Sequence, residues 1–213
     1  MARKIPPATV NRLPVYLRAL LDLSRRGITV ASSETIATES QINAAQIRKD
    51  LSLIGAPGTR GIGYDVQGLL AEINDEMGLH GEYGVALVGY GKLGAALVGY
   101  QGFNERGYRI RAIFDSDPSI IGSKVGEIEV EGLTKMGVLL AARSIEIAVI
   151  ATPAESAQKA ASELVKGGIL SILNFAPVAL ELPEGVAVRN VDMSIELQLL
   201  SFHNYSRQAT DGL

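Results

Sequence analysis

VALVGYGKLGAAL, residues 85–97, is the segment that predicts the fold most specifically. An apolar run at 85–88 predicts a buried parallel strand, and the glycine pattern Gly89-Tyr90-Gly91-Lys92-Leu93-Gly94 follows it at once. Gly89 suits a tight turn, Gly91 suits close approach of a pyrophosphate, and Gly94 suits packing of a helix on the strand. The stretch therefore predicts a dinucleotide-binding turn, with the anion at the N-terminus of the following helix.

Asp115 supports this interpretation by its position. It comes directly at the end of the next predicted strand, after residues 110–114, and lies 21 positions after Gly94. A carboxylate at this spacing can accept hydrogen bonds from the adenosine ribose hydroxyls. Because it also repels a 2′-phosphate, we expect NAD(H) rather than NADP(H). A glycine-rich turn without a ligand is the alternative.

Strands and helices alternate through the rest of the chain. The pattern predicts helices at 93–100, 134–143 and 154–166, a small β element at 125–130, and strands at 145–152, 169–174 and 186–191. Such alternation is typical of a doubly wound parallel sheet, whose ligands bind outside the carboxyl ends of the strands. Two of these ends, Thr152-Pro153 and Asn174-Phe175, are candidates for the nicotinamide half of the site, although each could be an ordinary turn.

The N-terminal third has a helical pattern instead. Apolar residues recur at helical spacing from 7 to 26, and shorter helices are expected at 33–40 and 44–54. Two short helices behind a longer one are typical of a helix-turn-helix. Residues 55–66, GAPGTRGIGYDV, favour the hairpin wing of a winged helix, with Arg60 at its tip. A connecting helix at 68–77 and a linker at 78–84 are expected to follow.

Charge separates the same two parts of the chain. Residues 1–66 hold nine basic residues (Lys and Arg) and five acidic residues (Asp and Glu), a net charge of +4. The remainder holds eleven basic and eighteen acidic residues, a net charge of −7. A basic block on an acidic body is expected when one domain meets a polyanion. In the 44–54 helix, Ile47, Leu51 and Ile54 form the buried stripe. The outer face then carries Gln46, Arg48, Lys49 and Ser52. A basic oligomerisation domain is the alternative.

Composition excludes several classes of protein. The 213 residues are 47% hydrophobic and 20% charged, as in ordinary globular proteins. Without cysteine, the chain can form no disulfide, thiolate metal site or thiol redox sensor, and we expect no metal partner. No apolar run is long enough to span a bilayer, and the N-terminus lacks the apolar core of a signal peptide. We therefore expect a cytoplasmic protein without a membrane partner.

Candidate catalytic groups are few. A dehydrogenase needs an acid or base near the hydride acceptor, commonly a His, Lys or Tyr. Of the two histidines, His80 lies in the predicted linker and His203 in the last predicted helix, and both are expected at the surface. Tyr100, in the predicted 93–100 helix, could face the dinucleotide or pack against the sheet. We expect no catalytic residue and no separate substrate domain.

The last segment, SIELQLLSFHNYSRQ at 194–208, predicts an amphipathic helix. Its apolar stripe, with nothing after it to cover it, is Ile195, Leu197, Leu199, Leu200 and Phe202. A terminal helix of this kind often docks on a partner subunit, although it could also fold back on its own chain. The expected fold class is α/β, with a winged-helix domain at 1–78, a Rossmann domain at 79–192 and a dimerisation helix and tail at 193–213.

Eight segments, in the same order along the chain, resemble the Rex family of bacterial redox-sensing repressors. They are KIPPATVNRLPVYLRAL, QIRKDLS, GTRGIGYDV, VALVGYGKLG, FDSDP, TPAESAQKAA, ILNFAPV and VRNVDMSIELQLLS. The resemblance implies a homodimer whose terminal helix is swapped between subunits. It also implies binding to a palindromic operator in double-stranded DNA when NADH is scarce, and release as NADH rises.

The resemblance implies roles for individual residues as well. Arg48 and Lys49 would enter or flank the major groove, Arg60 would reach the minor groove, and Arg12 would contact a phosphate. Ser33 and Gln46 are assigned to the same DNA-binding set. NADH or NAD⁺ would be held by Gly89, Gly91, Lys92, Leu93, Gly94, Tyr100, Asp115, Thr152, Pro153, Asn174 and Phe175. Arg18, Tyr100 and Asp192 resemble a trio that links the DNA-binding helix to the cofactor pocket.

We therefore expect a transcriptional repressor that senses the NADH/NAD⁺ ratio. One alternative is an NAD-dependent oxidoreductase with an N-terminal helical extension, which turnover of a small alcohol, aldehyde or hydroxy acid would reveal. Another is a DNA-binding protein with an empty Rossmann domain. An unchanged nucleotide response in Asp115→Ala would indicate that case.

Overall fold

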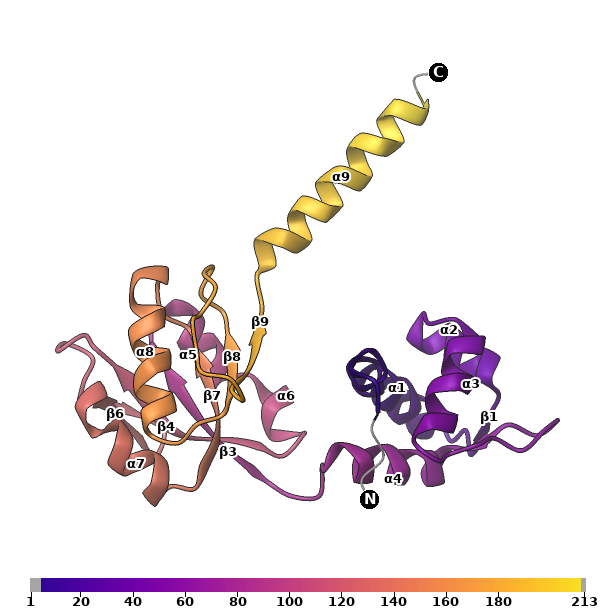
Figure 1. The fold of residues 1–213 in the computed structure, drawn as a ribbon, viewed down its shortest axis with the longest axis horizontal. Helices are drawn as coiled ribbons and strands as arrows, with labels where there is room; N and C mark the ends of the chain where they lie inside the picture. Colours follow the sequence, from indigo (N-terminus) through magenta and orange to yellow (C-terminus); the bar gives the residue numbers. More distant parts are fainter. Residues whose placement is uncertain (1–4, 212–213) are drawn as a thin grey trace. The chain divides into compact units, whose positions relative to one another are not determined.

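The chain folds into two units, and the boundary between them along the chain falls within the expected linker. In the computed structural model, residues 5–211 are described, with side chains for residues 5–207. One unit comprises residues 1–81 and the other residues 82–213 (Figure 1). Residues 1–4 of the expected first domain and residues 212–213 of the expected tail lie outside the described residues. The domain bounds given above stay predictions.

The first unit contains the predicted helices. They are α1 (Pro7–Arg25), α2 (Ser33–Ser40), α3 (Ala44–Leu53) and α4 (Val66–Met77). Side-chain caps set three of the starts: Ser32 accepts from the Thr35 N–H, Asn43 from the Ala45 N–H, and Asp65 from the Gly68 N–H. The predicted α3 stripe is confirmed, because Ile47, Leu51 and Ile54 are all buried in one core with α1 and α4.

The wing is a short hairpin in this unit. Strand β1 (Val30–Ala31) pairs antiparallel with β2 (Tyr64–Asp65), and a bridge between Thr59 and Gly63 closes the turn that holds Arg60. Helix α4 begins at Val66 rather than at the predicted residue 68, because Asp65 ends β2 and caps the helix directly.

The second unit is a seven-stranded sheet in the order β5-β6-β4-β3-β7-β8-β9. Its strands are β3 (Tyr83–Val88), β4 (Tyr108–Asp115), β5 (Lys124–Val125), β6 (Ile128–Gly132), β7 (Ile145–Ile150), β8 (Ser171–Asn174) and β9 (Ala187–Asn190). All neighbours pair in parallel except β5 with β6, which form a hairpin. The six parallel strands have the doubly wound order, and the order reverses between β3 and β7. The predicted parallel sheet is confirmed.

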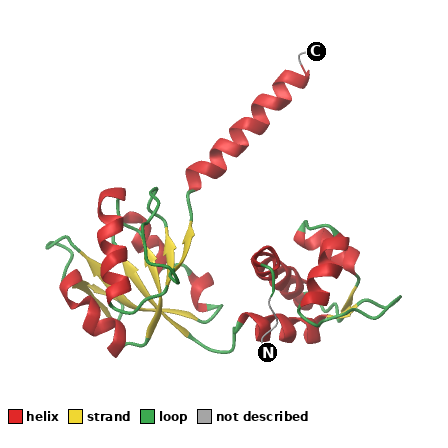
Figure 2. Cartoon of the chain, viewed as in Figure 1, coloured by secondary structure: helices red, strands yellow, loops and turns green. Residues whose placement is uncertain are grey.

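Helices cover both faces of this sheet (Figure 2). One face packs under η1 (Leu133–Lys135), α7 (Met136–Ala142) and α8 (Ala154–Lys166), and the other under α5 (Lys92–Val98) and α6 (Gln101–Asn104). The core of the first face includes Phe114, Met136 and Leu164, which are fully buried or nearly so. The α5 face is covered less completely, because α5 and α6 are short.

The predicted single helix at 93–100 is wrong at its end. Helix α5 stops at Val98, and Tyr100 has an extended backbone with φ −76° and ψ 104°. The Tyr100 N–H donates to the Leu97 carbonyl, which tightens the last turn, and the Tyr100 carbonyl accepts from the Phe103 N–H, which starts α6. Tyr100 therefore lies in a break between two helices, and 54% of its surface is exposed.

The chain ends in α9 (Met193–Asp211), which follows β9 (Figure 1). The predicted apolar stripe is present and exposed within the chain, with relative exposures of 52% for Ile195, 65% for Leu197 and 64% for Phe202. Among the helices of residues 5–211, we find none of the length and apolar character that crossing a membrane requires.

Candidate functional site

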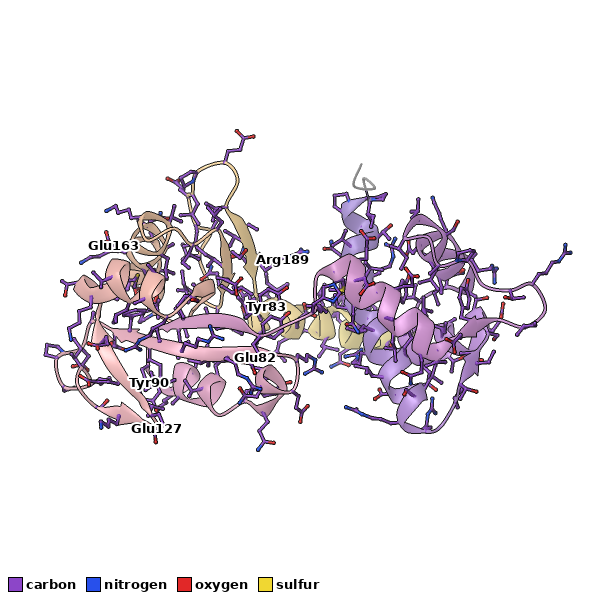
Figure 3. All side chains as sticks on the ribbon, turned by 90° about the horizontal axis from the view of Figure 1, so that it is seen from below. Glu82, Tyr83, Tyr90, Glu127, Glu163 and Arg189 are labelled. Carbon is purple, nitrogen blue, oxygen red and sulfur yellow. The ribbon has the colours of Figure 1, made fainter. Side chains whose placement is uncertain are left out.

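The carboxyl ends of four neighbouring strands form one rim in the second unit. The Gly89 N–H donates to the Phe114 carbonyl, which joins β3 to β4. The Ala151 N–H donates to the Val88 carbonyl, and the Phe175 N–H donates to the Ile150 carbonyl. These bonds bring Asp115, the glycine turn, Thr152 and Phe175 to the same edge. In Figure 3, Tyr90 marks this end of β3, and Glu82 and Tyr83 mark the opposite end.

The glycine turn, residues 89–94, has the geometry that the pattern predicts. Gly89 has φ +96°, and a Cβ there would lie 2.8 Å from the Ala151 carbonyl oxygen. A Cβ on Gly94 would lie 2.0 Å from the Gly89 carbonyl oxygen, so only glycine lets α5 approach β3 this closely. A Cβ on Gly91 would meet no atom of residues 5–211 within 4 Å. The turn is thus closed toward the protein and open at Gly91, where Lys92 and Leu93 begin α5.

Asp115 lies beside this turn, at the end of β4. Its Oδ2 accepts from the Tyr90 N–H at 2.6 Å, and its Oδ1 accepts from the Ser116 and Asp117 N–H groups at 2.7 and 2.9 Å. The carboxylate therefore orients the glycine turn. Sequence spacing placed Asp115 correctly but gave no sign of the bond to Tyr90.

Thr152 supplies an unsatisfied polar atom to the same rim. Its Oγ1 is buried without a hydrogen-bond partner among the side chains that the structure describes, and its Cγ2 borders Gly89. Buried hydroxyls usually have a partner. An orphaned hydroxyl beside an open glycine turn fits a bound dinucleotide, and Pro153, at the N-terminus of α8, lies next to it.

The side chain of Asn174 binds backbone groups of the loop that follows β8. Its side chain is fully buried, and its Nδ2 donates to the Ala176 and Val178 carbonyls and to Asn190 Oδ1, at 3.0–3.1 Å. Its Oδ1 accepts from the Ala176 N–H at 3.0 Å. The amide is therefore used in fixing the loop that carries Phe175, a half-buried side chain that packs on the same sheet face as Tyr90 and Ala151.

The three expected switch residues lie in different units. Arg18 is exposed on α1 of the first unit. In the second unit, the Tyr100 ring packs edge-on against Phe103 with centroids 5.2 Å apart. Asp192 accepts from the Ser194 N–H at 2.9 Å and from the Ser194 hydroxyl, so it caps the start of α9, and these two bonds hold its pKa below the usual range.

The expected DNA-binding side chains gather around α3 and the wing. Arg48 Nη1 donates to Ser33 Oγ at 2.7 Å and to Glu34 Oε1 at 3.0 Å. A hollow of about 500 Å³ is lined by Arg48, Ser33, Glu34 and the wing residues 58–64. Lys49 and Arg60 are exposed. The hollow therefore brings α2, α3 and the wing turn together on one surface.

Arg12 and Gln46 have an unexpected partner. Both donate to the carboxylate of Asp50, which is fully buried on α3 and was not recognised in the sequence. The signal that could have found it is the helical period, because position 50 is three residues after Ile47 and four before Ile54. The adjacent charges of Lys49 and Asp50 suggest an exposed turn of helix instead.

Other candidate sites are weaker. His80 lies 3.6 Å from Asp75 with both side chains exposed, and His203 is exposed beside Phe202. Within the described part of the chain, no group of His, Asp and Glu side chains is arranged to hold a metal ion.

Comparison with known proteins identifies the family. Residues 4–52 match the family model "Putative DNA-binding protein N-terminus", and residues 80–178 match the model "CoA binding domain". Proteins named redox-sensing transcriptional repressor Rex are 48% identical in Streptomyces griseus and 42% identical in Pelotomaculum thermopropionicum, each over 211 residues. These alignments cover 99% of this chain, and 83% and 99% of the relatives. The chain belongs to the Rex family.

Solved structures of a Rex-family repressor have the same fold as this chain over 98% of its length. RSP, a Rex-family repressor, in complex with β-NAD⁺ and operator DNA has a TM-score of 0.89 at 31% identity, covering 98% of this chain and 96% of that one. RSP in complex with β-NADH has a TM-score of 0.86 at 30% identity, covering 98% of both chains. The curated Rex relatives are named transcriptional repressors, which agrees with the expected repressor and not with the oxidoreductase alternative.

Proposed function

We propose that this chain is a DNA-binding transcriptional repressor that senses the NADH/NAD⁺ ratio and releases its operator when NADH binds. The observation that carries the proposal is the glycine turn, open at Gly91 and bordered by Asp115 and the orphaned Thr152 hydroxyl, in a chain that also has a winged helix. The names and ligands of its Rex relatives support it.

In this proposal the rim of the second unit binds NADH or NAD⁺. The pyrophosphate lies over Gly91, where Gly94 and the turn bring the backbone N–H groups at Lys92 and Leu93 close to it. Asp115 accepts from the ribose hydroxyls while it keeps its bond to Tyr90. On the nicotinamide side, Thr152 gains a hydrogen-bond partner, and Pro153, Phe175 and Tyr100 shape the pocket while Asn174 fixes its loop.

The surface of α3 and the wing binds a palindromic operator. Arg48 and Lys49 enter or flank the major groove, and Arg60 reaches the minor groove from the wing turn. Ser33 holds Arg48 at 2.7 Å and thereby orients it. A palindrome needs two recognition helices, so the DNA-binding form is a homodimer.

The homodimer is proposed to form by exchange of α9. Its apolar stripe is exposed in one chain, and the open α5 face of the sheet has an apolar hollow of about 480 Å³ that could receive such a helix. The hollow is lined by Tyr100, Phe103, Tyr108, Ile147, Leu173 and Arg189, among others. Since large exposed apolar patches mark interaction sites, α9 of a second copy is the proposed occupant.

The proposed switch is a change in the arrangement of the two subunits. Bound NADH favours a dimer in which the two α3 helices no longer match the half-site spacing, and Arg18, Tyr100 and Asp192 are the residues proposed to couple the pocket to the helices. Tyr100 is suited to this role because it lies in a helix break and lines the hollow. A coupling of a few kcal/mol would move most of the population. We place this activity in the cytoplasm, where NAD(H) and DNA are both present.

Fluorescence anisotropy tests the proposal. A labelled palindromic A·T-rich duplex is titrated with the protein at fixed salt, because phosphate contacts make DNA affinity strongly salt-dependent. Release by NADH but not by an equal concentration of NAD⁺ is expected. Binding that is indifferent to both nucleotides would contradict the sensing role, and absence of binding would contradict the DNA-binding role.

A further inference from the structure

A carboxylate without exposed surface lies between α1 and α3 in the first unit, one residue after the proposed DNA contacts. Asp50 of α3 is fully buried and accepts from four side chains, which we call the Asp50 cluster. They are Thr9 Oγ1 at 2.9 Å, Arg12 Nε and Nη2 at 2.6 and 2.9 Å, Tyr16 OH at 2.7 Å, and Gln46 Nε2 at 2.9 Å.

Three of these donors form one stripe of α1. Thr9, Arg12 and Tyr16 are spaced three and four residues apart, so they face α3 together. Thr9 and Tyr16 are themselves buried, with relative exposures of 2% and 0%. These α1 side chains therefore hold α3 by hydrogen bonds to the Asp50 carboxylate, in addition to the apolar contacts of the surrounding core.

This arrangement is poorly explained by stability alone. Burying an ion pair costs desolvation free energy, and an apolar pair of similar volume is often equally stable. Directional bonds to a buried carboxylate instead select one orientation, because any rotation of α3 leaves a buried charge without its donors. Arg48 and Lys49 lie on the outer face of the same helical turn, so their direction depends on that orientation.

We propose that Asp50 is a positioning residue of the DNA-binding surface, which fixes the orientation of α3 on α1. Arg12 acts through Asp50 and not through contact with a DNA phosphate, since two of its nitrogens already donate to that carboxylate. This inference rests on the proposed DNA-binding function and assigns a specificity role to Thr9 and Tyr16, which are buried, and to Arg12, which is partly exposed.

Removing the buried hydroxyls tests the proposal most directly. Tyr16→Phe and Thr9→Val each delete one bond to Asp50 without changing charge or the surface. We measure affinity for a duplex selected by the wild-type chain from a randomised pool, and for a scrambled duplex of the same composition, over a range of salt concentrations. Tyr83→Phe, in the second unit, is the control.

The expected result is loss of specificity. The ratio of the two affinities falls by roughly tenfold, because hydrogen bonds to charged groups are among the stronger ones. Affinity for the scrambled duplex and the salt slope stay at the wild-type values, since no phosphate contact is lost. Ratios within about twofold of wild type for both variants, in protein that circular dichroism shows to be folded, would overturn the proposal.

Arg12→Gln separates a positioning role from a phosphate contact. Arg25→Gln is its matched control, because Arg25 also lies on α1 and pairs with an aspartate, Asp22, but at an exposed position. A positioning role lowers operator affinity alone. A phosphate contact lowers both affinities equally and reduces the salt slope by about one, and that result would also overturn the proposal.

A measurement without DNA keeps this inference separate from the proposed function. Residual dipolar couplings of the free protein report the angle between α1 and α3. A changed angle in Tyr16→Phe or Thr9→Val supports positioning, and an unchanged angle in both contradicts it. If the wild-type chain selects no sequence from the pool, the proposed function fails, and the couplings alone decide whether Asp50 orients α3.

Discussion

Arg48 Nη1 lies 3.0 Å from Glu34 Oε1, so a carboxylate of α2 holds the principal proposed recognition residue of α3. Both side chains are more than half exposed. The backbone N–H of Glu34, the Ser33 hydroxyl and Arg48 hold the pKa of Glu34 below its usual range, so the residue is charged at neutral pH. An acid at this position repels phosphates while it directs Arg48, which is a means of selecting one sequence over others.

Glu34→Gln is expected to weaken discrimination more than binding. Affinity for a scrambled duplex should rise by roughly threefold, because one repulsive charge is removed, and the ratio of operator to scrambled affinity should fall. Anisotropy titrations of both duplexes at one salt concentration measure this. Glu39→Gln is the control, since Glu39 lies on the same helix but pairs with Arg26. An unchanged ratio would show that Glu34 takes no part in specificity.

Alanine at Gly91 and at Gly94 should have opposite effects. Gly91→Ala adds a Cβ into open space, so the protein folds with its Tm unchanged, but NADH binding is lost because the methyl group occupies the proposed pyrophosphate position. Gly94→Ala places a Cβ against the Gly89 carbonyl and should destabilise the fold by about 1–3 kcal/mol. Thermal unfolding and NADH fluorescence separate the two. Normal NADH binding by Gly91→Ala would show that the pyrophosphate lies elsewhere.

Acid should remove the stabilisation that the Asp50 cluster provides. Burial raises the pKa of Asp50, but the bonds from Arg12, Tyr16, Gln46 and Thr9 outweigh it and leave that pKa well below the usual range. The stabilising contribution is therefore complete above the unfolded pKa of about 3.9 and is lost as the pH falls below it. Urea unfolding followed by NMR signals of α1 and α3 should show that wild type and Asp50→Asn differ in stability at pH 7 and converge in acid. A difference that grows with acid would contradict this.

A charge on the apolar stripe of α9 should dissociate the dimer. Leu197→Glu puts a carboxylate where the partner is proposed to cover the helix, and the dimer dissociation constant should rise by about tenfold or more. Gln198→Glu adds the same charge to the neighbouring polar position and serves as the control. Sedimentation equilibrium measures both. Equal dissociation constants for the two variants would show that α9 does not form the interface.

The order of the elements, the parallel sheet and the glycine turn follow from the amino-acid sequence alone. These depend on local signals, which are the apolar period, helix caps such as Ser32 and Asp65, and the spacing of the three glycines in the turn. The same signals failed at Tyr100, because the break after α5 depends on how the Gly99–Gly102 segment closes one turn and opens the next. Gly99, directly after α5, is a helix-stop residue that the prediction of one helix over 93–100 passed over.

The pairing of charged and polar groups, by contrast, is visible only in the folded chain. Asp50 lies 34 to 41 residues from Thr9, Arg12 and Tyr16, and Asp115 lies 25 residues from the N–H that it accepts from. The helical period places Asp50 on the buried face of α3, but it does not identify the donors that offset the desolvation cost, because these come from another element. The resemblance predicts that Arg12 contacts DNA, and the folded chain adds a partner, Asp50, that the sequence did not reveal.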